Sequence, residues 1–245
     1  MRLGVNIDHI ATLRQARGAA HPDPVEAAHI CKQVGAHAVV MHLREDRRHI
    51  QDRDLFHVKK KVPIRLNLEM SIAPSIARLA EKLKPDQVTL VPEKRQERTT
   101  EGGLNLMRKT QEIRRCVEKL KSRGTQVSLF IDPEFRQIEM AKRLGVDAVE
   151  FHTGDYANAF GVGRLPPGRQ ARTELERLKK AAGRAARERL HVYAGHGLDY
   201  QNVRPVAKIP AIEELNIGYA IVTRALWVGF ENAVREMLGL LTSIE

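Results

Sequence analysis

Residues 42–50, with the sequence HLREDRRHI, contain two histidines, three arginines and two carboxylates. They directly follow the apolar run of residues 38–41. Histidines and carboxylates can exchange protons near neutral pH, and arginine binds anions because its guanidinium stays charged. An apolar run that ends in such a cluster is typical of a buried strand with a site at one edge of its sheet. We therefore expect acid/base or anion-binding chemistry here.

Similar groups follow other apolar runs. Glu69, Glu150 and His196 stand at the ends of three further predicted strands, as His42 does at its own. Each one alone has an ordinary reading, because a single His commonly packs or caps and a single Glu commonly faces solvent. Together in one low-dielectric cup, two imidazoles and two carboxyl groups would have separated pKa values, as general acids and bases require. These four residues are our candidate catalytic set.

Two groups of residues could bind anions. The segments AGHGLDY and NIGYAIV carry glycines that would let a phosphate approach backbone N–H groups. Basic side chains would face them across the same mouth: His9, Arg17, Arg44 and His49. Glycines are also ordinary in such turns, so this signal is weak by itself. Two cationic sites in one mouth would indicate two phosphorylated substrates.

A metal site is the alternative use of these side chains, because His and Glu with open positions suit zinc or iron. The sequence contains neither HxH nor HExxH, and its one close ligand pair on a predicted strand is Glu150 with His152. We therefore predict acid/base catalysis with no metal and no cofactor.

The elements that would position these groups alternate regularly. Eight apolar runs of strand length occur in order: residues 3–7, 36–43, 64–68, 87–91, 126–131, 148–151, 190–193 and 212–217. Amphipathic segments of helix length accompany them: residues 24–34, 52–61, 74–83, 104–123, 135–144, 168–189, 202–207 and 220–241. This alternation predicts an α/β fold, a single (β/α)8 TIM barrel with extra helical elements over residues 1–245.

Some boundaries and connections can also be read. Pro24 suits the first turn of a helix behind Asp23. Glycines suited to a left-handed helix cap follow three of the predicted helices: Gly35, Gly124 and Gly145. The connections over residues 92–103 and 154–168 are longer than usual and follow strand ends. Each is a candidate lid or a surface excursion.

Composition narrows the class of protein. The 245 residues are 42% hydrophobic and only 4% aromatic, and the formal net charge is +11. Lys and Arg are spread along the chain and mixed with acids, whereas nucleic-acid binders tend to cluster basic residues and interleave aromatics. Cys31 and Cys116 lie far apart in helix-like patterns, so we expect buried reduced thiols. With no signal-like or spanning apolar segment, we expect a cytoplasmic protein without membrane or nucleic-acid partners.

Segments across the whole chain resemble one family. They are GVNIDHIATLRQARG, HLREDRRHIQDRD, LNLEM, LVPEKRQERTTEGG, VSLFID, VEFHTG, AGHGL and ELNIGYAIV, and they include all eight predicted strand ends. Together they resemble pyridoxine 5'-phosphate synthase. The resemblance implies a TIM barrel that assembles as a homo-octamer, a tetramer of dimers. It implies condensation of 1-deoxy-D-xylulose 5-phosphate with 3-amino-2-oxopropyl phosphate, without a cofactor, to give pyridoxine 5'-phosphate, phosphate and water.

The resemblance also implies roles for single residues. His42 and Glu69 would accept protons, His196 would donate one, and Glu150 would stabilise a transition state. The deoxyxylulose phosphate would be bound by Asp8, His9, Arg44, His49 and Thr99. The amino-ketone phosphate would be bound by Asn6, Arg17, Gly197, Gly218 and Tyr219. Residues 94–103 would close over the mouth.

Tyr219 departs from the family pattern, which has His at this position. If a backbone N–H contacts the phosphate there, the change is tolerable; if the imidazole does, the amino-ketone phosphate site is altered. The segment 158–169 is also longer and more basic than the family pattern.

Two rival classes stay open at this point. One is another phosphate-binding barrel, such as an isomerase or aldolase; a Schiff-base aldolase would want a lysine inside a strand, yet Lys94 lies beyond its strand. The other is a basic nucleic-acid-binding protein, which would bind polyanions in a strongly salt-dependent way without turnover.

Overall fold

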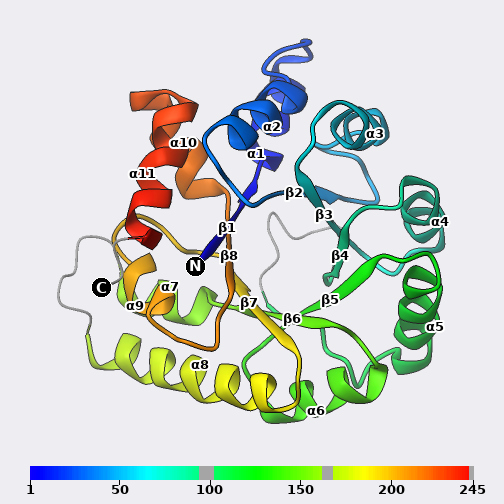
Figure 1. Cartoon of the computed structure of the whole chain (residues 1–245), viewed down its shortest axis with the longest axis vertical. Coiled ribbons are helices and arrows are strands. Elements are labelled where there is room, and N and C mark those ends of the chain that lie inside the picture. Colours follow the sequence, from blue (N-terminus) through cyan, green and yellow to red (C-terminus); the bar gives the residue numbers. More distant parts are fainter. Residues whose placement is uncertain (94–101, 162–167, 243–245) are drawn as a thin grey trace.

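A closed barrel of eight parallel strands forms the centre of the protein in a computed structural model, which describes residues 1–93, 102–161 and 168–242. Each strand pairs with the next, and the last pairs with the first. Helices surround the barrel on its outside (Figure 1). The predicted TIM barrel is therefore confirmed.

The strands agree closely with the predicted apolar runs. They are β1 Arg2–Asn6, β2 Ala38–Leu43, β3 Arg65–Met70, β4 Gln87–Leu90, β5 Gln126–Ile131, β6 Ala148–His152, β7 His191–Gly195 and β8 Glu214–Ile217. Every predicted run overlaps one strand, and the run 126–131 matches β5 at both ends. Such runs can be recognised because strands of a barrel are covered on the outside by helices and carry few charges on that face.

Most helices also match their predictions. They are α2 Pro24–Gln33, α3 Asp52–Lys61, α4 Pro74–Leu83, α5 Thr110–Lys121, α6 Phe135–Leu144, α8 Arg169–Arg187 and α9 Val203–Ala207. The Asp23 carboxylate caps α2 by accepting a hydrogen bond from the Val25 N–H. Gly35, Gly124 and Gly145 have φ values of 88°, 81° and 73°, as expected for left-handed helix ends.

The structure corrects four helix predictions. Helix α1 Asp8–Arg17 was not predicted, and α7 Gly154–Phe160 occupies the start of what we expected to be a loop. The predicted helix 220–241 is two helices, α10 Tyr219–Val228 and α11 Phe230–Thr242, because Gly229 leaves helical geometry at φ 82°. Helix α5 begins late, after Lys109 at a left-handed φ of 56°.

Alternation along the strands separates an apolar outer face from a polar interior. In β3, Leu66 and Leu68 join the hydrophobic core between strands and helices, whereas Arg65 reaches Glu214 of β8, which is not a neighbouring strand, at 3.1 Å. Glu69 shares the face of Arg65 because side chains on a strand alternate with period two. The inward positions nearest the strand ends therefore converge on one mouth.

Among the described residues, no helix is both long and apolar enough to cross a bilayer.

Candidate active site

A cavity of about 750 Å³ opens at the carboxyl ends of the strands. Nearly all of the predicted site residues line it: Asn6, Asp8, His9, His42, Arg44, His49, Glu69, Glu150, His196, Gly197, Gly218 and Tyr219. They come from strands β1, β2, β3, β6, β7 and β8 or from the segments that follow these strands. The closed barrel brings them together although they are spread over more than two hundred positions of the sequence.

Two predicted site residues are not found there. Thr99 lies outside the described residues. Arg17 is exposed in the last turn of α1 and does not line the cavity of its own chain. Asp8 and His9 begin the same helix at the mouth, and nine residues at 1.5 Å each put Arg17 about 13 Å further along the axis. The direction of α1, which the sequence prediction lacked, accounts for this.

Three acids in the mouth have raised pKa values. Burial raises the pKa of Asp8 to about 7 and that of Glu150 to about 8. Burial, together with the charges of Glu150 and Asp8, raises the pKa of Glu69 well above its ordinary value. Asn216 Nδ2 donates to Glu150 Oε2 at 2.7 Å, and the His42 N–H donates to Asp8 Oδ1 at 2.8 Å. The carboxyl groups are thus both held in place and able to carry protons near neutral pH.

The imidazoles of the mouth favour their neutral forms. Burial, with the neighbouring His49 and Arg44, lowers the pKa of His42 to about 3. Burial also lowers the pKa values of His49 and His196 to about 4. His42 Nδ1 lies 4.0 Å from Glu69 Oε2, and within the described part of the chain His42 Nε2 has no hydrogen-bond partner. Among the described residues, His42 Nε2 is therefore a buried nitrogen without a partner, and it can accept a proton.

The chain after β2 is fixed by a buried ion pair. Arg14 of α1 bonds both carboxylate oxygens of Asp54, at 2.8 and 2.6 Å, and donates to the His49 carbonyl at 3.3 Å. The Ile50 N–H donates to His49 Nδ1 at 2.8 Å, so in the neutral ring the proton sits on Nε2. Both contacts position His49 as a hydrogen-bond donor at the rim of the mouth.

Arg44 faces the same part of the mouth. Its Nε lies 3.7 Å from Glu93 Oε1, which also accepts the Glu45 N–H at 2.9 Å. Two ion pairs lie beside it: Arg48 with Asp46 at 2.6 Å and Arg47 with Asp52 at 2.9 Å.

Across the mouth, close backbone approaches require glycine. A Cβ at Gly195 would lie 2.6 Å from Glu150 Oε1, and one at Gly218 would lie 2.8 Å from Asn6 Cβ. Gly218 directly precedes α10, whose first-turn N–H groups have no partners within the helix. The side chain of Tyr219 is 68% exposed and its ring packs edge-on against His9, with centroids 5.3 Å apart. Backbone N–H groups are therefore the natural anion ligands at this end.

Some lining residues were missed or left outside the predicted set. Thr12 and Thr223 line the cavity one helical turn after Asp8 and Tyr219. This four-residue spacing can be recognised only when the starts of both helices are known, and the sequence predicts neither α1 nor a helix start at Tyr219. Asn216, at the end of β8, contacts Glu150.

Ligand atoms of Asp8, His42 and Glu69 lie within 4.8 Å of one another and could hold a metal ion. Sequence spacing could not reveal this trio, because its members come from three neighbouring strands or their ends. Metal-free catalysis therefore stays a prediction.

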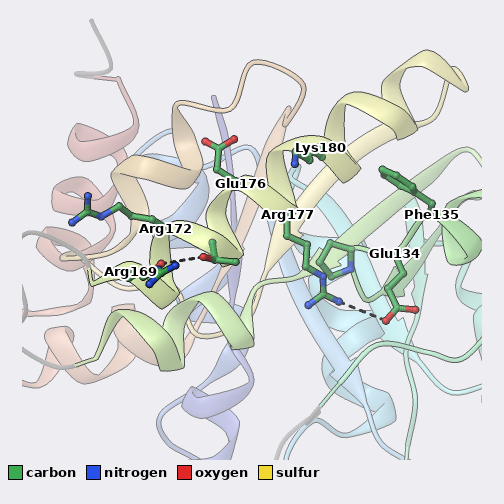
Figure 2. A pocket seen from close by; sticks show the side chains of 9 residues that line it. Glu134, Phe135, Arg169, Arg172, Glu176, Arg177 and Lys180 are labelled. Carbon is green, nitrogen blue, oxygen red and sulfur yellow. Dashed lines mark hydrogen bonds and ion pairs between the residues drawn. The ribbon is translucent and has the colours of Figure 1, made fainter.

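A second cavity, of about 960 Å³, lies outside the barrel between α8 and residues 133–135 (Figure 2). Arg177 reaches across it to Glu134 at 3.6 Å and also pairs with Asp155 and Glu174. None of the predicted site residues lines this cavity. The mouth of the barrel, where acids, bases and open backbone donors meet, is the better candidate.

The fold and the mouth define a TIM-barrel protein whose cavity of carboxyl groups, imidazoles and glycines lies at the carboxyl ends of the strands. Solved structures with a similar fold include KGPDC from Streptococcus mutans (TM-score 0.66, 11% identity, 99% of this chain and 97% of that one). Another is 3-hexulose-6-phosphate synthase (TM-score 0.61, 18% identity, 98% and 100%). At these identities they support the fold alone.

The chain belongs to the family described as pyridoxal phosphate biosynthesis protein PdxJ, whose model matches residues 3–243. It is 51% identical over 240 residues to pyridoxine 5'-phosphate synthase of Sulfurihydrogenibium sp. (strain YO3AOP1), covering 97% of this chain and 96% of the relative. It is 48% identical over 245 residues to the enzyme of that name from Coxiella burnetii (strain Dugway 5J108-111), covering both chains completely. The resemblance predicted from the sequence is confirmed, in preference to the rival classes.

Proposed function

We propose that this protein condenses 1-deoxy-D-xylulose 5-phosphate with 3-amino-2-oxopropyl phosphate, closing the pyridine ring of pyridoxine 5'-phosphate with release of phosphate and water. The observation that carries this proposal is the mouth itself. Acids with raised pKa values and imidazoles with lowered ones lie between two groups of anion ligands. Membership of the PdxJ family and relatives named pyridoxine 5'-phosphate synthase support this proposal.

One anion site would be formed on the side of β2. The positive charge of Arg44 and the Nε2–H of His49 can bind the phosphate of deoxyxylulose phosphate, with His9, Asp8 and Thr99 completing the site. The other would lie at the start of α10. Gly218, Tyr219 and Gly197 offer backbone N–H groups for the amino-ketone phosphate, with Asn6 as a further ligand. Arg17 does not line the cavity of its own chain, so it would complete this site only from a neighbouring subunit of the octamer proposed below.

Protons would move between carboxyl groups with raised pKa values and imidazoles with lowered ones. Burial raises the pKa of Glu69 and lowers that of His42, whose Nδ1 lies 4.0 Å from Glu69 Oε2, so the pair offers one acid and one base. His42 is the first acceptor, and Glu69 becomes an acceptor once it has given up its proton. Bound phosphates bring negative charge, which raises the pKa of His196 and favours the imidazolium that acts as donor.

Glu150 would remain close to the reacting atoms and stabilise positive charge as it ionises. Addition of the amine to the ketone, loss of water, elimination of phosphate and ring closure are successive proton transfers. Such steps can be carried out by acids and bases of this kind without a redox group or metal. A closed mouth would protect the imine and enamine intermediates from water.

The direct test mixes purified protein with both substrates and follows pyridoxine 5'-phosphate and free phosphate. We expect both products in a one-to-one ratio, and none when either substrate is omitted. Folded protein that gives no product with both substrates present would refute the assignment.

We also propose that residues 1–245 form one domain that assembles into a homo-octamer, a tetramer of dimers, in the cytoplasm. Two features support this: within the described residues one hydrophobic core cluster includes strands and helices all around the barrel, and Cys31 and Cys116 are buried free thiols. On α10, Leu226 and Trp227 are 67% and 84% exposed, which suits burial against another subunit. Light scattering after size exclusion should give eight chains, and fewer for Trp227→Ser.

A further inference from the structure

A carboxylate and two imidazoles form a row across the ends of three neighbouring strands. His152, the last residue of β6, has its Nδ1 3.3 Å from Oδ1 of Asp132, which directly follows β5. The ring centroid of His152 lies 5.0 Å from that of His196, which directly follows β7, at an interplanar angle of 48°. His152 is 7% exposed. Neither Asp132 nor His152 lines the mouth, whereas His196 does.

The surroundings hold this row tightly. Asp132 Oδ1 also accepts a hydrogen bond from the Gly103 N–H at 2.9 Å. Phe130 packs edge-on against the His152 ring, with centroids 5.4 Å apart. On the other side, a Cβ at Gly154 would lie only 2.4 Å from His152 Nε2. The ring therefore has little freedom to move, and glycine at position 154 is what leaves room for it.

The main chain of His196 is held from the same strand end. His196 has a φ of 77°, a left-handed conformation that is strained for a residue other than glycine. Thr153 Oγ1 lies 2.6 Å from the His196 carbonyl oxygen and 2.8 Å from that of Gly195. The Thr153 N–H donates to the Gly195 carbonyl as well, at 2.9 Å. The end of β6 thus fixes both the side chain and the backbone of His196.

We propose that Asp132, His152 and Thr153 are positioning residues for His196. The Asp132 carboxylate holds the His152 ring by accepting a hydrogen bond from His152 Nδ1–H, and this ring orients the His196 imidazole. Thr153 holds the strained backbone of His196. The inference rests on the proposed function, in which His196 donates a proton. It extends that function to residues which do not line the cavity and to which the sequence analysis assigned no role in the reaction.

The row also contributes to the lowered pKa of His196. Burial and then the neighbouring His152 lower the pKa of His196 to about 4. The hydrogen bond from His152 lowers the pKa of Asp132, and Arg177 of α8 adds to this effect. A change in the His152 ring must therefore change the titration of His196, which a purely structural role would not require.

Two variants and one matched control test the proposal. His152→Asn removes the ring, whereas Gly154→Ala keeps every titratable group and only displaces the ring. His191→Asn is the control, because His191 pairs with Glu213 at 2.9 Å at the opposite end of the barrel. Two quantities are measured: kcat and KM for both substrates, and the titration of the His196 ring by NMR without substrate. The His196 signal is identified by its loss in His196→Asn.

We expect kcat to fall at least about 10-fold in His152→Asn and Gly154→Ala, because small displacements of a reacting group reduce rates strongly. KM should stay within about threefold, since the lost contact acts on the transition state. The titration midpoint of His196 should rise in His152→Asn, because a neighbour that lowers it is gone. His191→Asn should leave both quantities unchanged.

An unchanged His196 titration in folded His152→Asn would overturn the proposal, whatever the rates are. An equal loss of kcat in His191→Asn would overturn it too, since it would indicate a general effect of losing a His–carboxylate pair. If His152→Asn does not fold, Gly154→Ala decides: wild-type kcat and an unchanged His196 signal refute the proposal. If the wild-type protein turns nothing over, the proposed function fails while the NMR titration still tests the contact.

Discussion

The buried ion pair between Arg14 and Asp54 supports the wall of the mouth that carries His49. The two side chains are 2% and 3% exposed and share bonds of 2.8 and 2.6 Å. Arg14→Ala would leave the Asp54 carboxylate buried, with the Gln51 N–H at 2.9 Å and the exposed Arg53 at 4.0 Å as its remaining partners. Removing one partner of such a pair costs about 3–5 kcal/mol of unfolding free energy.

The same change should weaken one substrate more than the other. Arg14 also donates to the His49 carbonyl, so its loss loosens the residue proposed to bind deoxyxylulose phosphate. The KM for that substrate should rise, whereas the KM for the amino-ketone phosphate should change little, because its proposed ligands at the start of α10 do not contact Arg14.

Urea unfolding at one fixed protein concentration measures the stability, and steady-state kinetics measure the two KM values. Arg235→Ala is the matched control, because Arg235 pairs with Glu231 on the surface of α11, with both side chains 55% exposed. Such an exposed pair contributes about 0.3–0.5 kcal/mol. If Arg14→Ala loses no more than this control, the pair does not support the fold as we argue.

Two substitutions in the mouth and the removal of metal ions each have a distinct expected outcome. Glu69→Gln should abolish turnover while sparing binding of both substrates by calorimetry; loss of folding would instead make Glu69 structural. Burial raises the pKa of Glu150 from 4.5 to about 8, so the folded protein binds this proton more tightly than the unfolded chain. The stabilisation from this bound proton is fully present below pH 4.5 and is lost as the pH rises to about 8. Between these pH values the unfolding free energy of Glu150→Gln should therefore vary less with pH than that of the wild type. Equal slopes for the two proteins would contradict the raised pKa. Dialysis against EDTA should leave turnover unchanged; activity lost and then restored by a divalent metal would assign Asp8, His42 and Glu69 as its ligands.

The strand pattern could be predicted because it is local. In β3, with the sequence RLNLEM, the two leucines and the methionine lie in the core between strands and helices. The alternate residues Arg65, Asn67 and Glu69 share the opposite face of the strand. Apolar burial on the outer face and period two along the strand are both visible in the sequence. Closing eight such strands brings their ends together, so the sequence was enough to assign Glu69 and Glu150 to one mouth.

Helix direction and single breaks could not be predicted in the same way. Because the pattern after the first apolar run does not indicate α1, the sequence predicts Arg17 at the mouth. In the structure Arg17 lies in the last turn of α1 and does not line the cavity of its own chain. Gly229 lies within one continuous helical pattern, and its positive φ, which divides α10 from α11, depends on how the second helix packs.

The sequence by itself determined the family, the barrel and the residues at the strand ends, because apolar runs and motif segments are properties of short stretches of chain. Only the tertiary structure decided the protonation states and the partners of those residues. The pKa of Glu150 depends on its burial and on Asn216, and the row from Asp132 through His152 to His196 joins three strands. Such distances arise only when the barrel closes, since electrostatic and hydrogen-bond energies depend on separation in space.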